Sequence, residues 1–241
     1  MQEKIKEEKR KYKVAVISAT PFHYHVGFYN KIFSCQDIDL HIYFCSDNSY
    51  NTKNPADGRI TENELDWGWK YEFLKNYSFS PSFSKGPFGL LNFGIWKKIK
   101  YGEYDAVILQ AWNNFTWWLS FLACRKFNAK VFFMTDANIL SKSRNTLKEQ
   151  FKNILLRYLF KNASGFLATG KSNEQMYSYY GADKNKMAPL NFSWGYEHFI
   201  KENDKLKNYK KEIRRRFEIM ADDFVFLFVG RLAEKKDCLI F

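Results

Sequence analysis

The sequence predicts an α/β fold of the Rossmann-like kind, built on a doubly wound parallel sheet. Short apolar runs alternate along the chain with segments of helical pattern. Several of these runs are apolar on consecutive residues, as strands covered on both faces are. The chain has 241 residues, of which 46% are hydrophobic and 19% aromatic, enough to fill one large core. Alternation of this kind is typical of parallel sheets with helices on both sides.

The apolar runs and helical patterns place the elements in chain order. The expected strands are Lys13–Ser18, Asp39–Ser46, Asp105–Ala111, Lys130–Thr135, Gly165–Thr169, Met187–Phe192 and Phe224–Val229. The expected helices are Val26–Ser34, Leu90–Lys100, Phe115–Phe127, Ser143–Asn162, Asn173–Gly181 and Asp204–Ile219. We expect Asn162 or Gly165 to end the fourth helix and Gly181 to cap the fifth.

Residues 47–88 interrupt this alternation. The segment is rich in Asn, Ser, Pro and Gly but also carries Trp67, Trp69, Tyr71, Phe73 and Phe79. A loop of this length inside a compact domain is usually functional. It can be a flap whose aromatic residues pack on the core or a loop that binds an acceptor, and the two roles are compatible.

The net charge of +12 is compatible with nucleic acid, anionic membrane or phosphorylated substrates as partners. Basic residues gather in 1–13, 142–161 and 201–216, where interspersed acids favour solvated helix faces, any of which can dock on a membrane. Because no nucleic-acid recognition pattern accompanies the charge, we expect no nucleic-acid partner.

Cysteine usage and hydropathy bear on the compartment. The four cysteines form no CxxC pair, which argues against a zinc site and suits a reducing compartment. The N-terminus lacks the apolar stretch of a signal peptide, and no window approaches 18 apolar residues. We therefore expect a cytoplasmic protein, with the inner membrane face as a further place of action.

The final segment carries a family resemblance. Phe228–Phe241, FVGRLAEKKDCLIF, resembles the first strand, loop and helix start of the second domain in GT4-type retaining glycosyltransferases, which have the GT-B fold. The resemblance implies that Arg231 and Lys236, or Lys235 if the register shifts by one, bind the donor diphosphate. A planar guanidinium and a mobile ammonium suit a leaving group that gains negative charge. The family's glycine after the lysine is Asp237 here, and a carboxylate beside phosphate is unfavourable.

Four earlier segments resemble the same family in the same order. They read VAVISATPFHYHVGFYNKI, LDWGWKYEFLKN, EYDAVILQAWNNFTWWLSFLACRKFNAKVFFMTDAN and SNEQMYSYYGADKNKMAPLNF, the second being similar to a segment of bacterial polysaccharide-building members. The resemblance implies a GT-B N-terminal, acceptor-side domain over 1–200. It further implies an interdomain linker helix over 201–223 and the start of a nucleotide-sugar-binding domain over 224–241. Because a lone apolar strand at a terminus would be an exposed edge, we expect this second domain to be truncated.

The resemblance also suggests residues of a site. In the family, the loop after the first strand approaches diphosphate and acceptor, so Gly27 is the candidate for close backbone approach. The amides at the start of the next helix can receive an anion. His23 and His25 flank this loop as candidate acceptor-side residues, or as ordinary polar loop residues.

The loops after the fourth and fifth of the family's strands often carry a histidine. Here they read Gln110-Ala111-Trp112 and Thr135-Asp136-Ala137, so no catalytic histidine is carried over. Trp112 is a candidate acceptor-side residue. Asp136 follows a strand, where α/β ligand sites form, and is the candidate catalytic residue that orients an acceptor hydroxyl. Capping of the next helix is the alternative role for Asp136.

Two motif matches are interpreted as coincidental. GFLATGKS, Gly165–Ser172, fits the phosphate-binding pattern GxxxxGK[ST], but its first glycine precedes a strand-like run instead of following one. Asp37-Ile38-Asp39 matches a metal-binding DxD triplet but sits ahead of a strand, where aspartate is common in turns. We expect no metal and no cofactor besides the nucleotide sugar that serves as donor.

The sequence thus predicts transfer of a sugar from a nucleotide-sugar donor to a glycan or lipid-linked acceptor, with retention of configuration implied by the resemblance. Closure around a donor needs both walls of a cleft, so we expect this chain to be inactive alone. The alternative is a non-catalytic module that binds an acceptor or a membrane and needs a separate donor-binding chain.

Overall fold

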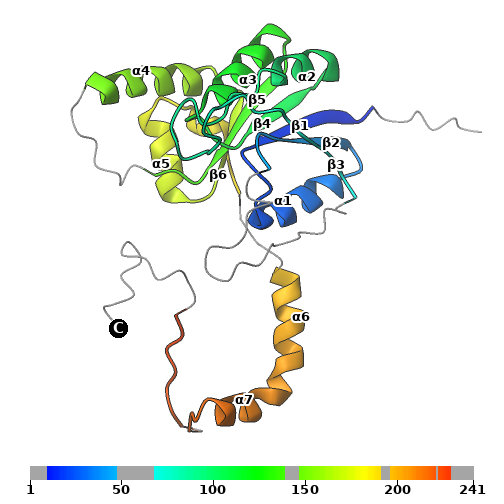
Figure 1. Ribbon diagram of the computed structural model, residues 1–241, viewed down its shortest axis with the longest axis vertical. Coiled ribbons are helices and arrows are strands. Elements are labelled where there is room, and N and C mark those ends of the chain that lie inside the picture. Colours follow the sequence, from blue (N-terminus) through cyan, green and yellow to red (C-terminus); the bar gives the residue numbers. More distant parts are fainter. Residues whose placement is uncertain (1–9, 48–67, 139–146, 191–195, 221, 229–241) are drawn as a thin grey trace, which may run out of the picture. The chain divides into compact units, whose positions relative to one another are not determined.

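The computed structural model describes residues 10–47, 68–138, 147–190, 196–220 and 222–228. The chain divides into two compact units, Met1–Trp194 and Gly195–Phe241. The first unit contains a seven-stranded sheet in the order β3-β2-β1-β4-β5-β6-β7 (Figure 1). This confirms the predicted α/β, Rossmann-like parallel sheet.

All neighbouring strands of the sheet run parallel. The strands are β1 (Tyr12–Ser18), β2 (Ile38–Phe44), β3 (Lys70–Phe73), β4 (Ala106–Leu109), β5 (Lys130–Thr135), β6 (Gly165–Ala168) and β7 (Met187–Pro189). The first unit's helices are α1 (His23–Phe33), α2 (Ile95–Gly102), α3 (Phe115–Lys126), α4 (Leu147–Lys161) and α5 (Lys171–Tyr179), with the short 3-10 helix η1 (Lys184–Lys186). Strand order reverses between β1 and β4, so the loops after these two strands diverge to opposite sides.

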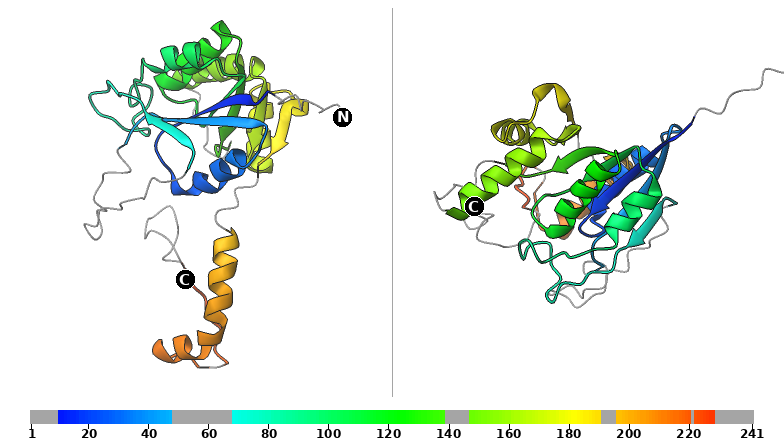
Figure 2. Two further views of the ribbon diagram at one scale, coloured as in Figure 1. Left: turned by 90° about the vertical axis from the view of Figure 1, so that its right-hand side faces the viewer. Right: turned by 90° about the horizontal axis from the view of Figure 1, so that it is seen from above.

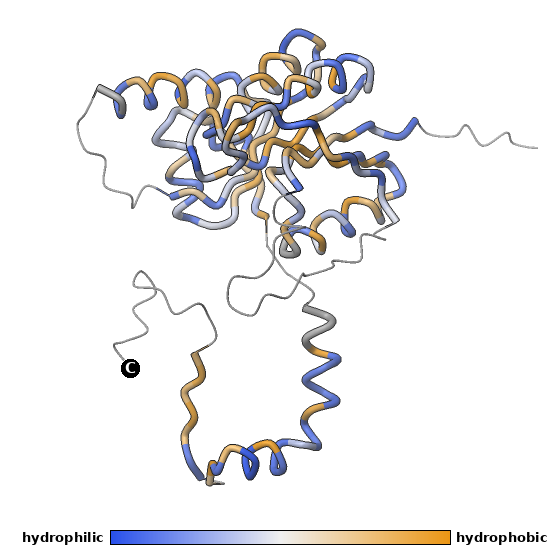
Figure 3. The backbone as a smooth tube through the Cα atoms, viewed as in Figure 1, coloured by the Kyte–Doolittle hydropathy of each residue, from blue (hydrophilic) through white to orange (hydrophobic). Residues whose placement is uncertain are grey.

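The core forms two layers because successive side chains of a strand point to opposite faces of the sheet. Ala15 and Ile17 of β1 pack in the layer with α2, α3, α4 and α5. Val14 and Val16 pack in the other layer, with α1 and Trp69. Figure 2 shows the sheet between these helices, and Figure 3 shows apolar colour along its central strands. Burial on both faces is why the strands read as unbroken apolar runs.

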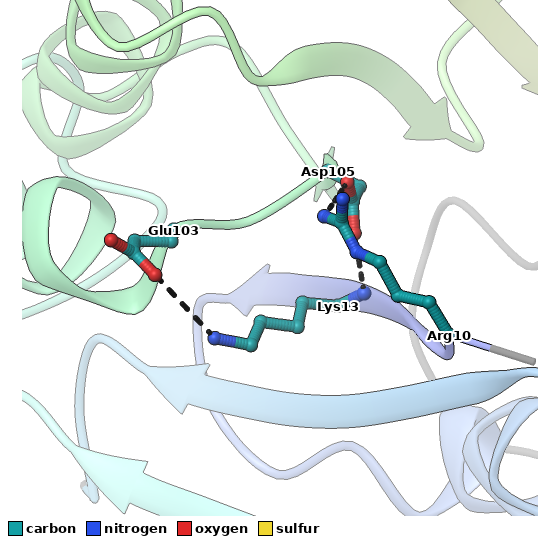
Figure 4. Close-up of polar contacts among 4 residues, drawn as sticks. All are labelled: Arg10, Lys13, Glu103 and Asp105. Carbon is teal, nitrogen blue, oxygen red and sulfur yellow. Dashed lines mark hydrogen bonds and ion pairs between the residues drawn. The ribbon is translucent and has the colours of Figure 1, made fainter. Parts of the chain in front are cut away.

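At the amino edge of the sheet, one carboxylate joins β1 to the turn before β4 (Figure 4). The Asp105 carboxylate accepts from the Arg10 guanidinium at 2.7 Å and from the Lys13 backbone N–H at 2.8 Å. The Lys13 ammonium lies 3.8 Å from Glu103, which follows α2 in a left-handed conformation. These contacts fix the start of both central strands, so their carboxyl ends are placed together at the other edge.

Several boundaries differ from the sequence-based expectation. β3 was not predicted, because it is a short edge strand whose pattern, KYEF, alternates charged and aromatic residues. Phe224–Phe228 form no strand, and no described strand lies beside them in their unit. α2 begins five residues later than predicted, because the preceding segment is held by buried hydrogen bonds of Asn92. Gly181 follows α5 with a φ of +87°, which confirms the predicted cap.

The second unit contains α6 (Tyr196–Leu206), the 3-10 helix η2 (Lys207–Tyr209) and α7 (Lys210–Arg216). The single helix predicted over Asp204–Ile219 is therefore divided by a 3-10 turn. Arg214 of α7 holds the segment that follows this helix. Its guanidinium donates to the Met220 carbonyl at 3.0 Å and to the Asp223 carbonyl at 2.9 Å. Within the described part of the chain, no helix has the length and apolar character needed to span a bilayer.

Candidate functional site

A hollow of about 540 Å³ lies at the carboxyl ends of β1, β4 and β5. In open α/β sheets, ligands bind outside the carboxyl ends of the strands, at the point where strand order reverses. The hollow occupies that point, because β1 and β4 are the pair at which the order changes. It is lined by Ala19, Phe22, His25, Phe83, Gln110, Ala111, Trp112, Asn113, Trp117, Met134, Thr135, Asp136 and Ala137.

Aromatic side chains from three separate segments form most of the apolar wall. Phe22, just before α1, packs edge-on against Phe83 with ring centroids 5.6 Å apart. Trp112 follows β4, and its carbonyl accepts from the Trp118 indole N–H at 2.9 Å, which holds the loop against α3. Trp117 of α3 is almost fully buried behind the hollow. A largely aromatic wall with few polar groups is the usual lining of a small-molecule site.

Two hydrogen-bond donors of this lining have no acceptor among the described residues. The Tyr29 hydroxyl donates to Gln110 Oε1 at 3.1 Å, which fixes the amide so that Gln110 Nε2 is left as an unpaired donor. The indole Nε1 of Trp117 is likewise buried without an acceptor. Buried polar groups are almost always paired, so these two donors indicate an acceptor-bearing ligand or an ordered water.

His25 lies in the first turns of α1 at the edge of the hollow. Its ring packs edge-on against Phe22, with centroids 5.6 Å apart, and is tilted against Tyr29 at 5.9 Å. Burial lowers the pKa of His25 to about 4. The imidazole is therefore neutral at pH 7, and it contributes a polar but uncharged ring to the lining.

Asp136 presents an exposed carboxylate to the hollow from the loop after β5. The loop is held by Asn173, whose side-chain amide donates to the Ala137 carbonyl at 2.8 Å and whose Oδ1 accepts from the Thr169 N–H at 3.2 Å. Thr135 is held from the same side by the Tyr177 hydroxyl, which accepts from the Thr135 N–H at 3.0 Å. Ala137 and Asn138, which follow Asp136 directly, are not helical, so Asp136 caps no helix that begins there.

The described part of the 47–88 insert packs on the core and also contributes a side chain to the hollow. Trp69 is buried against the core and donates its indole N–H to Asn30 Oδ1 at 2.9 Å. Phe83 reaches the hollow because the buried Asn114 amide donates to the Phe83 carbonyl at 3.3 Å and to the Gly86 carbonyl at 2.7 Å. Phe79, by contrast, is fully exposed. Trp67 lies outside the described residues.

The remaining predicted site residues are placed differently. Gly27 does not lie in a loop: it is the fifth residue of α1, which begins three residues earlier than predicted, and it does not line the hollow. From the fifth residue on, backbone amides are bonded within a helix, so the Gly27 N–H cannot meet a ligand. His23 is the first residue of α1, and its side chain lies outside the described part. Arg231, Lys235 and Lys236 also lie outside the described residues.

The two motif coincidences have structural explanations. Gly165 begins β6, so the GFLATGKS match contains a strand where a phosphate loop would be needed. A Cβ at Gly165 would lie 2.7 Å from the Phe132 ring, which explains the glycine by packing. In the DxD match, Asp39 pairs with the Lys70 ammonium at 3.1 Å. Within the described residues, no three His, Cys, Asp or Glu side chains gather as a metal site requires.

No family model matches the chain, and no curated protein matches it. Among solved structures, Anabaena Alr3699/HepE in complex with UDP and glucose is 15% identical, covers 75% of this chain and 44% of its own, and gives a TM-score of 0.46. UDP-N-acetylglucosamine 2-epimerase from Rickettsia bellii is 12% identical, with 88% and 52% covered and a TM-score of 0.47. MurG of Acinetobacter baumannii is 14% identical, with 75% and 45% covered and a TM-score of 0.42.

The chain spans about half the length of each of these proteins. Similarity at this level does not assign a function to the chain. Of the residues that line the hollow, sequence reasoning named His25, Trp112 and Asp136 and missed Phe83 and Trp117. Sequence reasoning places Gln110 in a loop and assigns it no donor role, although its position directly after β4 is a usable signal.

Proposed function

We propose that this chain forms the acceptor-side part of a GT-B glycosyltransferase of the GT4 type, which moves a sugar from a nucleotide-sugar donor to a glycan or lipid-linked acceptor. The observation that supports this most is the hollow at the strand-order switch. It has an aromatic wall, an exposed carboxylate and two buried donors that find no acceptor among the described residues. The five family-like sequence segments support the reaction class.

The lining suits a saccharide. A sugar ring offers an apolar C–H face to an aromatic wall and hydroxyl oxygens to donors at its edge. In the proposed pose, Trp112 meets the ring face and Gln110 Nε2 donates to a sugar oxygen. The Asp136 carboxylate accepts from the reacting hydroxyl, orients it, and can take up its proton as the new bond forms. Because His25 is neutral at pH 7, it adds a polar ring to the edge of the hollow without adding a charge.

The donor side of the proposal rests on residues outside the described part. Arg231 and Lys236 would bind the diphosphate and neutralise the charge that develops as the sugar leaves. His23, as the first residue of α1, would stand beside the acceptor. No metal is needed in this scheme, because the two cations supply the positive charge. We also propose that the protein acts in the cytoplasm, because the scheme requires a supply of nucleotide sugars.

Saturation-transfer NMR with UDP-glucose, GDP-mannose and free saccharides tests the proposal. We expect at least one saccharide to bind at the hollow. Trp112→Ala should weaken saccharide binding about ten-fold through loss of the aromatic contact. Asp136→Asn should leave saccharide binding unchanged. Phe79→Ala, an equally aromatic but exposed position of the insert, is the matched control and should change nothing.

Two outcomes would count against the proposal in different ways. Absence of saccharide binding by the wild-type chain, or equal loss in the Phe79→Ala control, would refute the assignment of the hollow. Sugar transfer by this chain alone would instead refute the expectation that a further donor-binding domain is required.

A further inference from the structure

An apolar ridge runs along the outer side of α4. Phe151 is 63% exposed, Ile154 66% and Tyr158 50%. At 100° per residue these three side chains fall within about 60° of the helix circumference, opposite the face that packs on the core. A helix on the surface of a globular protein normally carries polar residues there. An outward row of large apolar side chains on α4 therefore indicates an interaction surface.

The ridge has a neighbour on α3. Figures 1 and 2 show α3 and α4 on the same face of the sheet, where their inner residues share one core layer. The Phe121 ring of α3 lies 6.1 Å from the Tyr158 ring of α4, so the two helices are in direct contact. Leu122, next to Phe121, is 48% exposed. Leu122 on α3 therefore adds one more exposed apolar side chain beside the ridge of α4.

A basic hollow of about 510 Å³ lies where these helices end. Four cations from four elements or their flanks line it, Arg125, Lys130, Lys161 and Lys186, together with Asn162 and Ser164. Among the residues that the structure describes, none of the four cations is in an ion pair and no carboxylate lines the hollow. This cluster of like charges is held together by the fold, since its members come from the ends of α3 and α4 and the starts of β5 and β7.

Helix capping accounts for only part of this arrangement. Cations near a helix C-terminus interact favourably with the helix dipole, which is a sufficient reason for Arg125 and Lys161. It gives no reason for Lys130, which begins β5, or for Lys186, which precedes β7. Gathering four like charges without an acid costs electrostatic repulsion that an anionic partner would remove.

The ridge and the basic hollow are continuous along both helices. Lys161 lies three residues beyond Tyr158 on α4, and Arg125 lies three residues beyond Leu122 on α3. Residues three apart are neighbours on a helix surface, so Tyr158 at the end of the ridge and Leu122 on α3 both adjoin the cationic hollow. Apolar side chains beside Lys and Arg are the composition by which peripheral proteins bind anionic bilayers, with cations on the headgroups and apolar groups at the acyl boundary.

We propose that the ridge of α4 and the basic hollow beside it dock this protein on an anionic phospholipid bilayer. Lipid fits better than nucleic acid, because a bilayer accounts for the exposed aliphatic Ile154 and Leu122 as well as for the aromatic residues, whereas base stacking would use only Phe151 and Tyr158. The surface is separate from the saccharide hollow, which lies at the carboxyl ends of the strands, whereas the basic hollow lies at the amino ends of β5 and β7. The proposal therefore stands or falls independently of sugar transfer.

Vesicle co-sedimentation of the full chain tests this surface. We expect binding to vesicles of phosphatidylcholine with one quarter phosphatidylglycerol, weak binding to phosphatidylcholine alone, and loss in about 0.5 M salt as charges are screened. Arg125→Glu with Lys161→Glu should lower the apparent affinity at least twenty-fold, since each cation near the surface is worth about five-fold. Phe151→Ser with Ile154→Ser should also weaken binding about ten-fold at unchanged charge.

Matched controls separate this surface from charge and exposed apolar area in general. Lys31→Glu with Lys85→Glu makes the same change in net charge on α1 and in the insert. Phe79→Ser with Phe88→Ser removes exposed aromatic side chains elsewhere. Both pairs should bind vesicles like the wild type, with circular dichroism to confirm folding.

Three results would overturn the proposal. The first is vesicle binding that persists in both surface variants, which would place the membrane contact elsewhere in the chain. The second is equal loss of binding in the controls. The third is absence of vesicle binding together with tight binding of an RNA oligonucleotide that the Arg125→Glu and Lys161→Glu pair abolishes.

Discussion

Replacement of Asn92 by alanine should destabilise the first unit by about 3 kcal/mol. The side chain is fully buried, and its amide donates to the carbonyls of Cys45 at 2.9 Å, Leu74 at 3.2 Å and Lys75 at 3.1 Å. Its Oδ1 accepts from the Thr116 hydroxyl at 2.9 Å. Alanine would leave these buried groups without their partner. A net cost of about 0.5–1.5 kcal/mol for each of four contacts, partly shared because two N–H groups serve three carbonyls, gives the estimate.

Urea unfolding followed by tryptophan fluorescence measures this cost. With a slope of about 2 kcal/mol per molar urea, the midpoint should fall by about 1.5 M. Asn113→Ala is the control, because Asn113 is exposed and makes one long hydrogen bond of 3.3 Å to the Phe83 carbonyl. It should change the free energy of unfolding by less than about 0.5 kcal/mol. A loss below about 1 kcal/mol in Asn92→Ala would show that water or rearrangement replaces the amide, and the reasoning would fail.

Further predictions concern burial, packing and the insert. Because burial lowers the pKa of His25 to about 4, its neutral form stabilises the fold fully above pH 6.5, and about 3 kcal/mol is lost as pH falls toward 4. This part of the pH dependence should be missing from His25→Gln in urea titrations at several pH values. Gly165→Ala should cost about 1–3 kcal/mol, since its Cβ would meet the Phe132 ring, whereas the exposed Lys171→Ala should leave the thermal midpoint unchanged. Tight Mg-ATP binding lost in Lys171→Ala would contradict the packing explanation of that motif. Trp69→Phe should cost about 1–2 kcal/mol through the lost indole bond to Asn30, and an unchanged urea midpoint would show that the insert is not held there.

The sequence predicted the sheet well because its strands are buried on both faces. An unbroken apolar run such as VAVI of β1 can be recognised from the sequence without knowledge of its neighbours in the fold. β3 gave no such run, because Lys70 is exposed and Tyr71, Glu72 and Phe73 are only partly buried at the edge of the sheet. The prediction of a strand after Asp223 was wrong for the opposite reason. The apolar residues there have the pattern of a strand, but strand formation also needs a neighbouring strand.

The hollow was predictable where it follows directly from strand ends. Trp112 and Asp136 come just after β4 and β5, and parallel strands bring those positions to one edge. Phe83 was not predictable, because its place depends on the Asn114 amide, a contact between residues 31 apart in the chain. Gly27 was misplaced because α1 starts directly after Phe22, earlier than its apolar pattern indicates.

The amide tethers of the insert have a consequence for how such a protein can diversify. Buried Asn92 and Asn114 hold the segment by backbone carbonyls, which every residue type carries, so the tethers do not depend on the side chains between them. Substitution of Phe83 or its exposed neighbours therefore costs the fold little while it changes one wall of the hollow. Selection can in this way act on ligand preference separately from folding, with the scaffold held constant.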